Sequence, residues 1–228
     1  MLSHFAAGSY HFVAAPGRPF SSGVVADQGF DLVHAVFFRP QQLSTGLEIA
    51  RRHVESAGRP VTALAAFELR IPEPLSREGF DAFNEPYVER MAALGLRSGA
   101  DWVTARTNVA VPVREPSLYA FTYTVPGGRS FPAFRLSGAT ETRRDGSAGD
   151  RLRSIVEALA MPMTELGVTW EASTAINVYG ASCVPVDEVA AALGAAAVHG
   201  ITWFPALPPL REYEFEIDAR GVGTEIVI

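Results

Sequence analysis

Residues 101–113 read DWVTARTNVAVPV, and the fold prediction starts from this stretch. Valines stand among short polar residues, which is typical of a β-strand, and Pro112 closes the segment. Arg106 lies in the first half of this predicted strand. An arginine there is either a solvated residue, paired with a carboxylate such as Asp101, or a fixed cation that binds an anion. An exposed pair contributes only ~0–1 kcal/mol, whereas a desolvated guanidinium without a partner costs roughly 3–5 kcal/mol.

The overall composition is that of a folded, acidic protein. Of the 228 residues, 48% are hydrophobic and 19% are charged, which is enough for a packed core. The net charge of −6 argues against nucleic-acid binding, which needs a basic surface. No apolar run approaches the ~18 residues that span a bilayer, and residues 1–17 lack the basic start and continuous apolar core of a signal peptide. We therefore expect no nucleic acid or membrane as partner, and a cytoplasmic location.

One residue type is missing altogether, because all 19 basic residues are arginines and the chain has no lysine. Schiff-base catalysis and covalent PLP attachment both need a lysine amine and are therefore excluded. The dinucleotide fingerprint, the P-loop, HExxH and GxSxG are absent as well. The single cysteine, Cys183, leaves no internal disulfide. Among the five histidines, His4 and His11 come nearest to a metal-ligand spacing, too loosely to predict a site. We expect neither a cofactor nor a metal.

The same order of predicted secondary-structure elements occurs twice in the chain. Apolar residues three and four apart, with β-type segments between them, predict β-β-α-β-α-β-β in each half, the copies lying about 110 residues apart. Ser76 and Gly58 are placed to cap helices of the first half, and Pro162 predicts a kink or a break in the second. The helices are expected at 43–58, 76–95, 149–167 and 185–200, and the strands at 10–25, 30–40, 61–72, 103–113, 118–125, 130–143, 168–180, 201–210 and 212–221.

The Pro126-Gly127-Gly128 turn is the natural boundary between the copies. The sequence thus predicts an α+β chain of two tandem domains, 1–128 and 129–228, each a mixed β-sheet with two helices packed on one face. The other face of each sheet needs a cover, and another copy of the unit would supply it.

Each half resembles the RidA (YjgF-type) family, small α+β proteins of chorismate-mutase-like fold that associate as trimers, with ligand sites between subunits. The segment GSYHF…FSSG looks like that family's N-terminal Tyr and Ser-Gly pair, at Tyr10, Ser22 and Gly23. The segment FDAFNEPYVERM is similar to its second helix and contains Asn84. The segment ARTNVAV looks like its Ala-Arg strand, which implies that Arg106 binds a substrate carboxylate.

The second half matches the family less completely. RLSGATE resembles the Ser-Gly strand, at Ser137 and Gly138, and EYEFEIDA resembles the closing strand with the family's acidic residue, at Glu214 or Glu216. The position of the arginine falls near His199, so the arginine is missing. The closing strand of the first half, LYAFTYTV, in turn has no carboxylate. Arg106 and a second-half glutamate can share a site only where an interface joins the halves.

RidA proteins of the standard kind hydrolyse enamines and imines to 2-keto acids and ammonia without metal or cofactor, and the resemblance implies similar chemistry. Arg106 would grip the substrate carboxylate, and Glu214 or Glu216 would position or deprotonate the attacking water. We expect a pathway-specific hydrolase or deaminase that acts on a small carboxylate-bearing imine, enamine or other C–N substrate. The predicted substrate-binding residues are Arg106, Tyr10, Ser22, Gly23, Asn84, Ser137 and Gly138.

Two other functions remain open: a ring-opening or chorismatase-like hydrolase, and a non-catalytic protein of the same fold that binds a small ligand or acts as a scaffold. The resemblance also implies a homo-oligomer, with a trimer as the first choice and a dimer as the second.

Several of these residues also have simpler structural interpretations. Alternation puts Glu214 and Glu216 on one face of their strand, opposite an apolar face, so they would form a solvated pair. His199 follows an Ala-rich helix, whose dipole its cation would complement. Cys183 is better explained as an incidental or buried thiol than as a nucleophile. Two polar residues of the matching central strands are further candidates to face the cleft, Glu68 and Asn177.

Overall fold

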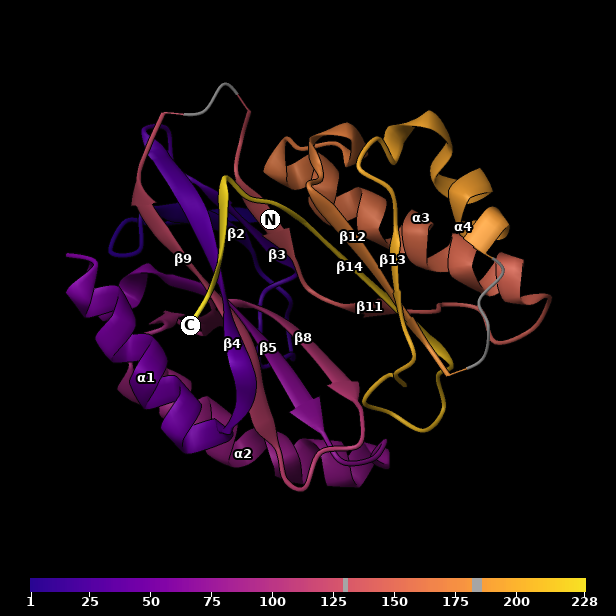
Figure 1. Ribbon diagram of the computed structural model, residues 1–228, viewed down its shortest axis with the longest axis horizontal. Coiled ribbons are helices and arrows are strands. Elements are labelled where there is room, and N and C mark those ends of the chain that lie inside the picture. The colour runs from indigo at the N-terminus through magenta and orange to yellow at the C-terminus, as the bar shows by residue number, and fades with distance from the viewer. Residues whose placement is uncertain (129–130, 182–185) are drawn as a thin grey trace.

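The computed structural model describes residues 1–128, 131–181 and 186–228, which form two β-sheets with helices on their outer sides (Figure 1). A five-stranded sheet has the order β15-β4-β9-β5-β8. A larger, eight-stranded sheet has the order β1-β2-β3-β10-β14-β12-β13, with β11 also paired to β14. This is the predicted α+β architecture, in which parallel and antiparallel pairs occur in both sheets.

Most strands lie within predicted segments, but the predicted strand over 10–25 divides into two, and the strands at Leu2–Phe5 and Thr224–Val227 were not predicted. In the five-stranded sheet they are β4 (Phe30–Gln42), β5 (Leu64–Ile71), β8 (Ala105–Ala110), β9 (Ser117–Pro126) and β15 (Thr224–Val227). In the larger sheet they are β1 (Leu2–Phe5), β2 (Tyr10–Val13), β3 (Gly23–Ala26), β10 (Phe134–Leu136), β11 (Ala139–Thr140), β12 (Ala175–Gly180), β13 (Thr202–Phe204) and β14 (Phe215–Gly221). A separate hairpin consists of β6 (Arg97–Ser98) and β7 (Asp101–Trp102).

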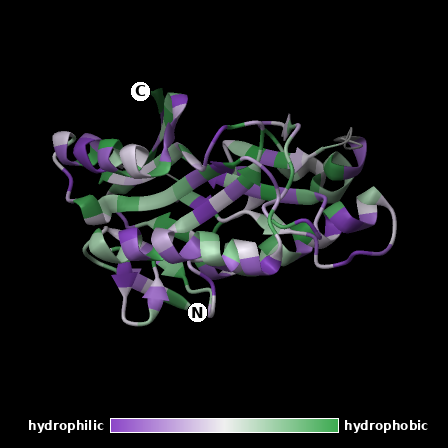
Figure 2. Cartoon of the chain, turned by 90° about the horizontal axis from the view of Figure 1, so that it is seen from below, coloured by the Kyte–Doolittle hydropathy of each residue, from purple (hydrophilic) through white to green (hydrophobic). Residues whose placement is uncertain are grey.

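The helices begin and end at the predicted types of residue. They are α1 (Leu43–Ser56), α2 (Arg77–Ala93), α3 (Ala148–Leu166) and α4 (Val186–Leu193). The Ser76 side chain accepts a hydrogen bond from the Gly79 N–H at the start of α2, which confirms the predicted cap. Gly58 follows α1 with a φ of 75°, and Gly167 closes α3 in the left-handed conformation. Hydrophilic and hydrophobic positions alternate along the helices in Figure 2, because one side of each packs on a sheet.

The break that Pro162 allows does not occur, and the predicted extent of the last helix is wrong. Helix α3 runs without a break through Pro162, because its buried residues, among them Leu159 and Met163, hold it against the larger sheet. Helix α4 is shorter than predicted, because Gly194 takes a φ of 60° and ends it. His199 is therefore an exposed turn residue some distance from the helix end, and the predicted interaction with the helix dipole is lost. Cys183 lies outside the described residues.

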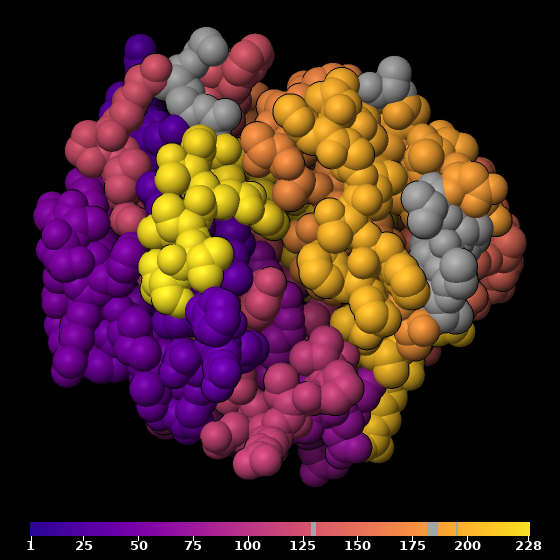
Figure 3. All heavy atoms as spheres, in the orientation of Figure 1, coloured from indigo at the N-terminus to yellow at the C-terminus, as the bar shows by residue number. Residues whose placement is uncertain are grey.

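The strands do not stay within the half of the chain that they come from. Strand β3 of the first half pairs with β10 of the second, and β15, at the end of the chain, pairs in parallel with β4. Figure 3 shows these last residues, in yellow, lying across the indigo and violet residues of the first half. The division of the chain into two domains near residue 128 stays a prediction. In both sheets, strands from before and after this residue are hydrogen-bonded to each other.

The helix-free faces of the two sheets cover each other, and the contact between them is polar. Arg135 on β10 donates hydrogen bonds to Glu68 on β5 at 2.9 Å and to Asp218 on β14 at 2.8 Å. Thr107 on β8 donates to Asp218 at 2.7 Å, and Asn177 donates to the same carboxylate at 3.0 Å. All five residues are buried. A charged network therefore joins the two sheets on the faces where another copy of the unit was expected as a cover. No helix in the described part of the chain is both long and apolar enough to cross a membrane.

Candidate active site

A cavity of about 160 Å³ lies where the edge strand β8 of the five-stranded sheet meets β14 and the β10–β11 connection of the larger sheet. Backbone bonds fix this junction: the Gly138 N–H donates to the Arg106 carbonyl at 3.0 Å, and the Arg106 N–H donates to Ser137 Oγ at 2.9 Å. The residues that line the cavity come from both halves: Gly17, Arg18, Pro19, Phe20, Arg77, Phe80, Asp81, Asn84, Arg106, Asn108, Gly138, Thr140, Pro209, Leu210, Tyr213 and Glu216.

Arg106 is buried in the wall of this cavity, with 3% of its surface exposed. Its Nη1 donates a hydrogen bond of 2.8 Å to Asn84 Oδ1 on α2. The rings of Phe20, Phe80 and Tyr87 surround the guanidinium, with centroids 4.6, 5.5 and 4.8 Å from Cζ. Arg106 is thus held in a single position by an amide and three aromatic rings.

No carboxylate in the described part of the chain forms an ion pair with Arg106. Burial, the largest cause, lowers the pKa of its guanidinium to about 10, and the neighbouring Tyr87 and Glu216 raise it only in part. Nη2 is buried and has no hydrogen-bond partner among the described residues. An uncompensated buried cation costs about 3–5 kcal/mol, and a bound anion would remove that cost. The geometry therefore fits the anion-binding interpretation of Arg106.

Glu216 is a buried acidic residue that faces the same cavity, whereas Asp81, which also lines it, is exposed. The Oε2 of Glu216 has no hydrogen-bond partner in the described chain. Burial and the negative charge of Asp218 raise the pKa of Glu216 to about 8, although Arg70, a hydrogen bond from the Asn108 backbone and Arg106 lower it. Glu216 is therefore mainly neutral at pH 7 and leaves the charge of Arg106 free for a ligand. A carboxyl group with a pKa near neutrality can act as a proton donor and, once ionised, as a base.

The missing side chain of Gly138 leaves the space that the Glu216 carboxyl group occupies. A Cβ added at Gly138 would lie 1.8 Å from Glu216 Oε1, so that any other residue at 138 would push the carboxyl group aside. In the Ser-Gly pair of the second half, Ser137 thus acts through its hydroxyl group, and Gly138 acts through its backbone N–H and its lack of a side chain.

The polar groups without partners gather in this cavity. Eight buried side-chain atoms in the described part of the chain have no hydrogen-bond partner, and four of them belong to Arg106, Asn108 and Glu216. Both the Nδ2 and the Oδ1 of Asn108 are among them. Since buried polar groups are nearly always paired, such a concentration indicates a site for a polar ligand.

A loop between β2 and β3 forms the mouth of the cavity. Phe20 of this loop contacts Arg106, and Arg18 lies 5.9 Å from the centre of the same ring. Arg18 is exposed and forms no ion pair in the described chain. Arg77 also lines the cavity, but Glu212 neutralises it at 2.6 Å. The site therefore has one buried cation and a second, solvent-exposed cation at its entrance.

Four of the predicted site residues line the cavity: Arg106, Asn84, Gly138 and Glu216. Ser137 lies outside it and accepts a hydrogen bond from the Arg106 N–H. Ser22 and Ser137 line a wider adjoining hollow of about 450 Å³, which shares Arg18, Phe20 and Gly138 with the cavity.

Three predicted site residues lie elsewhere. Tyr10 is a fully buried core residue whose hydroxyl donates to the Leu64 carbonyl at 3.1 Å. Gly23 is packed under Leu166. Glu214 is exposed and pairs with Arg151 at 2.8 Å. The expectation of a solvated pair of glutamates is thus wrong for Glu216, because β14 begins at Phe215 and only residues within the strand are covered by the other sheet.

The polar residues of the central strands do not reach the cavity. Glu68 and Asn177 belong to the network between the sheets, where Arg135 and Asp218 satisfy them. His34 lies beside Glu68, and burial lowers its pKa to about 4, so it stays neutral there.

The sequence-based prediction missed Asn108 and the aromatic and basic residues of the entrance. Asn108 could have been found, since it lies two residues after Arg106 on a strand and therefore shares its face. Phe20, Arg18 and Tyr213 come from loops or from the edge of a strand, and their meeting at the cavity follows from tertiary contacts alone.

The fold and the site together define an α+β protein with a buried, unpaired cation in a cavity suited to a small anionic ligand. The sequence matches the family model described as 2-aminomuconate deaminase CnbZ over residues 2–226, and the chain belongs to this family. It is 30% identical, over 98% of both chains, to a curated 2-amino-5-chloromuconate deaminase from Comamonas testosteroni. The predicted family resemblance is thereby confirmed, and the protein is an enzyme of the deaminase class.

Solved structures agree with the fold. A chorismatase covers 89% of this chain and 77% of its own with a TM-score of 0.55 at 13% identity. A member of the YjgF/YER057c/UK114 family from Mycobacterium tuberculosis matches 42% of this chain and 82% of its own, with a TM-score of 0.34 and 18% identity. The predicted α+β fold is thus confirmed.

Proposed function

We propose that this protein hydrolyses the C–N bond of a 2-amino-2,4-dienedioate, a small unsaturated dicarboxylate of the 2-aminomuconate type. The observation that carries the proposal is the set of unpaired buried groups on Arg106, Asn108 and Glu216 around one cavity. The family description and the name of the curated relative support the same substrate class. The cavity of about 160 Å³ is smaller than the ~300–1,000 Å³ of pockets for drug-sized ligands, as a small metabolite requires.

Arg106 anchors the carboxylate next to the amino-bearing carbon. Its free Nη2 donates to a carboxylate oxygen, while Asn84 holds Nη1 in place. The Asn108 side chain offers one donor and one acceptor on the same face of β8, so its Oδ1 accepts from the substrate amino group. The reacting carbon is thereby oriented toward Glu216.

Glu216 moves the protons. As a neutral acid it protonates the enamine carbon, which gives a C=N bond with a positive charge and leaves Glu216 as the carboxylate. The carboxylate then takes a proton from water, and the hydroxide adds to the amino-bearing carbon of the C=N bond. Glu216 finally transfers a proton from the new hydroxyl group to the nitrogen, the C–N bond breaks, and ammonia and a 2-keto acid leave. One water is consumed, and Glu216 returns to its neutral form.

Arg18 binds the second carboxylate. A dicarboxylate held at Arg106 by one end extends toward the entrance, where Arg18 is the cation without an ion pair among the described residues. Because Arg18 is exposed, its contribution to binding is screened by salt.

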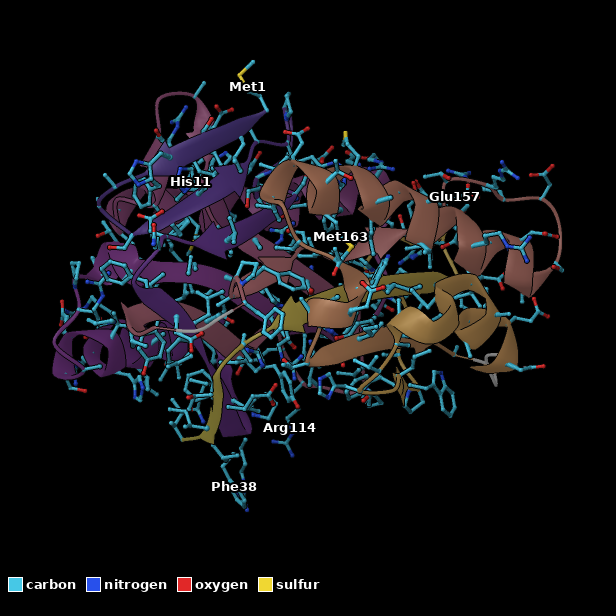
Figure 4. All side chains as sticks on the ribbon, turned by 90° about the horizontal axis from the view of Figure 1, so that it is seen from above. Met1, His11, Phe38, Arg114, Glu157 and Met163 are labelled. Atoms are coloured by element: carbon cyan, nitrogen blue, oxygen red, sulfur yellow. The ribbon has the colours of Figure 1, made fainter. Side chains whose placement is uncertain are left out.

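The decisive experiment measures ammonia release from 2-aminomuconate, formed in situ, by the wild type, by Arg106→Ala and by Arg114→Ala. Truncating one partner of a buried charge pair costs ~2–5 kcal/mol, so we expect kcat/KM to fall about 30-fold or more for Arg106→Ala. Arg114 is exposed on the surface (Figure 4), and its variant should match the wild type.

Failure of the wild type to accelerate ammonia release would refute the proposed substrate class. Tight binding of the dicarboxylate without turnover would favour the non-catalytic alternative, and cleavage of a C–O bond instead would favour the chorismatase-like one. An Arg106→Ala enzyme as active as the wild type would refute the assigned role of Arg106.

A further inference from the structure

A second cluster of polar side chains lies on the N-terminal strands, away from the cavity. His4 on β1 and His11 on β2 stack with ring centroids 4.4 Å apart. Asp27, after β3, approaches both: its Oδ2 lies 2.9 Å from His4 Nε2, and its Oδ1 lies 2.9 Å from His11 Nδ1. Figure 4 shows His11 on these strands, on the opposite side of the molecule from Phe38.

The pairing of the strands brings these three residues together. His4 and His11 are direct cross-strand partners in the antiparallel β1–β2 pair. His11 is opposite Val25 in the β2–β3 pair, and Asp27 lies two residues after Val25, on the same face. The three side chains are therefore neighbours on one face of the sheet, although the sequence separates them by up to 23 residues.

The contact between His11 and Asp27 is close but does not have the geometry of a hydrogen bond. Asp27 Oδ1 is buried and has no hydrogen-bond partner in the described chain, although His11 Nδ1 stands 2.9 Å away. The lone pairs of Asp27 Oδ1 are therefore available to a further atom, such as a metal ion.

We propose that His4, His11 and Asp27 bind one divalent transition-metal ion, with zinc as the reference case. Zn–N and Zn–O bonds of about 2.0–2.2 Å place two donors on one ion about 3–4 Å apart. The ligand atoms of the cluster lie within 4.8 Å of one another, so shifts of about 1 Å in exposed side chains bring all three into range. Two imidazoles and a carboxylate suit zinc, nickel, copper and cobalt, and water fills the remaining positions.

The ion would fasten the edge of the larger sheet. Strand β1 is bonded only to β2 within its sheet, and a metal would add a link from β1 to the residue that follows β3. The histidines must be neutral to bind, so metal affinity falls at acidic pH.

The test is equilibrium dialysis of the metal-free protein against ZnCl₂ at pH 7.5, with Cys183→Ser in every variant because a thiolate binds zinc wherever it lies. We expect one zinc per chain in the parent and in His199→Ala, whose histidine is exposed elsewhere. Loss of one ligand should weaken binding at least about tenfold in His11→Gln and in Asp27→Asn. Cobalt bound in place of zinc should give a visible absorption band that both variants lose.

Circular dichroism of each metal-free variant shows whether it is folded, and His4→Gln supplies a further variant at a half-exposed position. No stoichiometric zinc in the parent, or equal zinc affinity in the parent and the folded variants, would overturn the proposal. The metal site does not depend on the proposed deaminase function, and either can fail alone.

Discussion

Burial changes the acid–base chemistry of Glu216. Its carboxyl group is shielded by both sheets and lies near the negative charge of Asp218, so its pKa rises from 4.5 to about 8. Between these values the folded protein holds a proton that the unfolded chain releases. The contribution of Glu216 to the free energy of unfolding therefore falls as the pH rises from about 4.5 to about 8, and it changes no further at higher pH.

The same pKa predicts a pH profile for the reaction. If neutral Glu216 donates the first proton, kcat/KM should fall about tenfold per pH unit above pH 8. Glu216→Gln should lose most of the activity at every pH while it keeps the fold, because glutamine resembles the neutral acid. The matched control is Glu214→Gln on the same segment, whose side chain is exposed and paired with Arg151. A wild-type rate that stays constant to pH 9.5 would contradict the role of Glu216 as the acid.

At the scale of single elements, the β2–β3 loop matters most for specificity. It connects two strands of the larger sheet, yet it carries Phe20 to the guanidinium of Arg106 on the other sheet. Gly17, with a φ of 75°, makes the turn that precedes Arg18. The loop thus couples the buried cation with the exposed one.

Arg18→Ala should separate substrates with one carboxylate from those with two. We expect about a fivefold lower kcat/KM for 2-aminomuconate, as suits an exposed charge pair, and no change for 2-aminoacrylate. The difference should shrink at 0.5 M salt. Arg77→Ala is the control at the same cavity and should have a smaller effect, because Glu212 already neutralises Arg77. Equal losses for both substrates would show that Arg18 does not bind the second carboxylate.

At the scale of the whole molecule, the polar contact between the sheets replaces the subunit contact that the family resemblance implies. Arg135 has 1% of its side chain exposed and bonds to Glu68 and Asp218, which come from different sheets. Its positive charge holds the pKa of Asp218 well below the usual range. The predicted trimer stays a prediction, and it would have to form around this two-sheet unit.

Arg135→Met should test how strongly the network holds the sheets together. The substitution leaves Glu68 and Asp218 buried without this cation, and we expect a loss of about 3–5 kcal/mol in the free energy of unfolding, measured with urea at pH 7. Arg52→Met is the control, since the Arg52 side chain is 72% exposed and its ion pair contributes little. A loss below about 1 kcal/mol for Arg135→Met would mean that apolar contacts, and not this network, join the sheets.

The family resemblance placed Arg106 and Asn84 in one site. The sequence by itself determined the helices, most of the strands, and the helix caps at Ser76 and Gly58. These features depend on periodicity and on residue types close together in the chain, which are visible without a fold. The absence of lysine likewise excluded two classes of chemistry from the sequence alone.

Tertiary structure decided which glutamate meets Arg106. Glu214 and Glu216 are equivalent by alternation, but only Glu216 lies within β14 and is covered by β8 of the other sheet. It also decided that Tyr10 belongs to the core, that Arg18 and Phe20 belong to the site, and that His4, His11 and Asp27 meet. Each of these depends on strand pairing or sheet packing between distant segments, which local patterns do not encode.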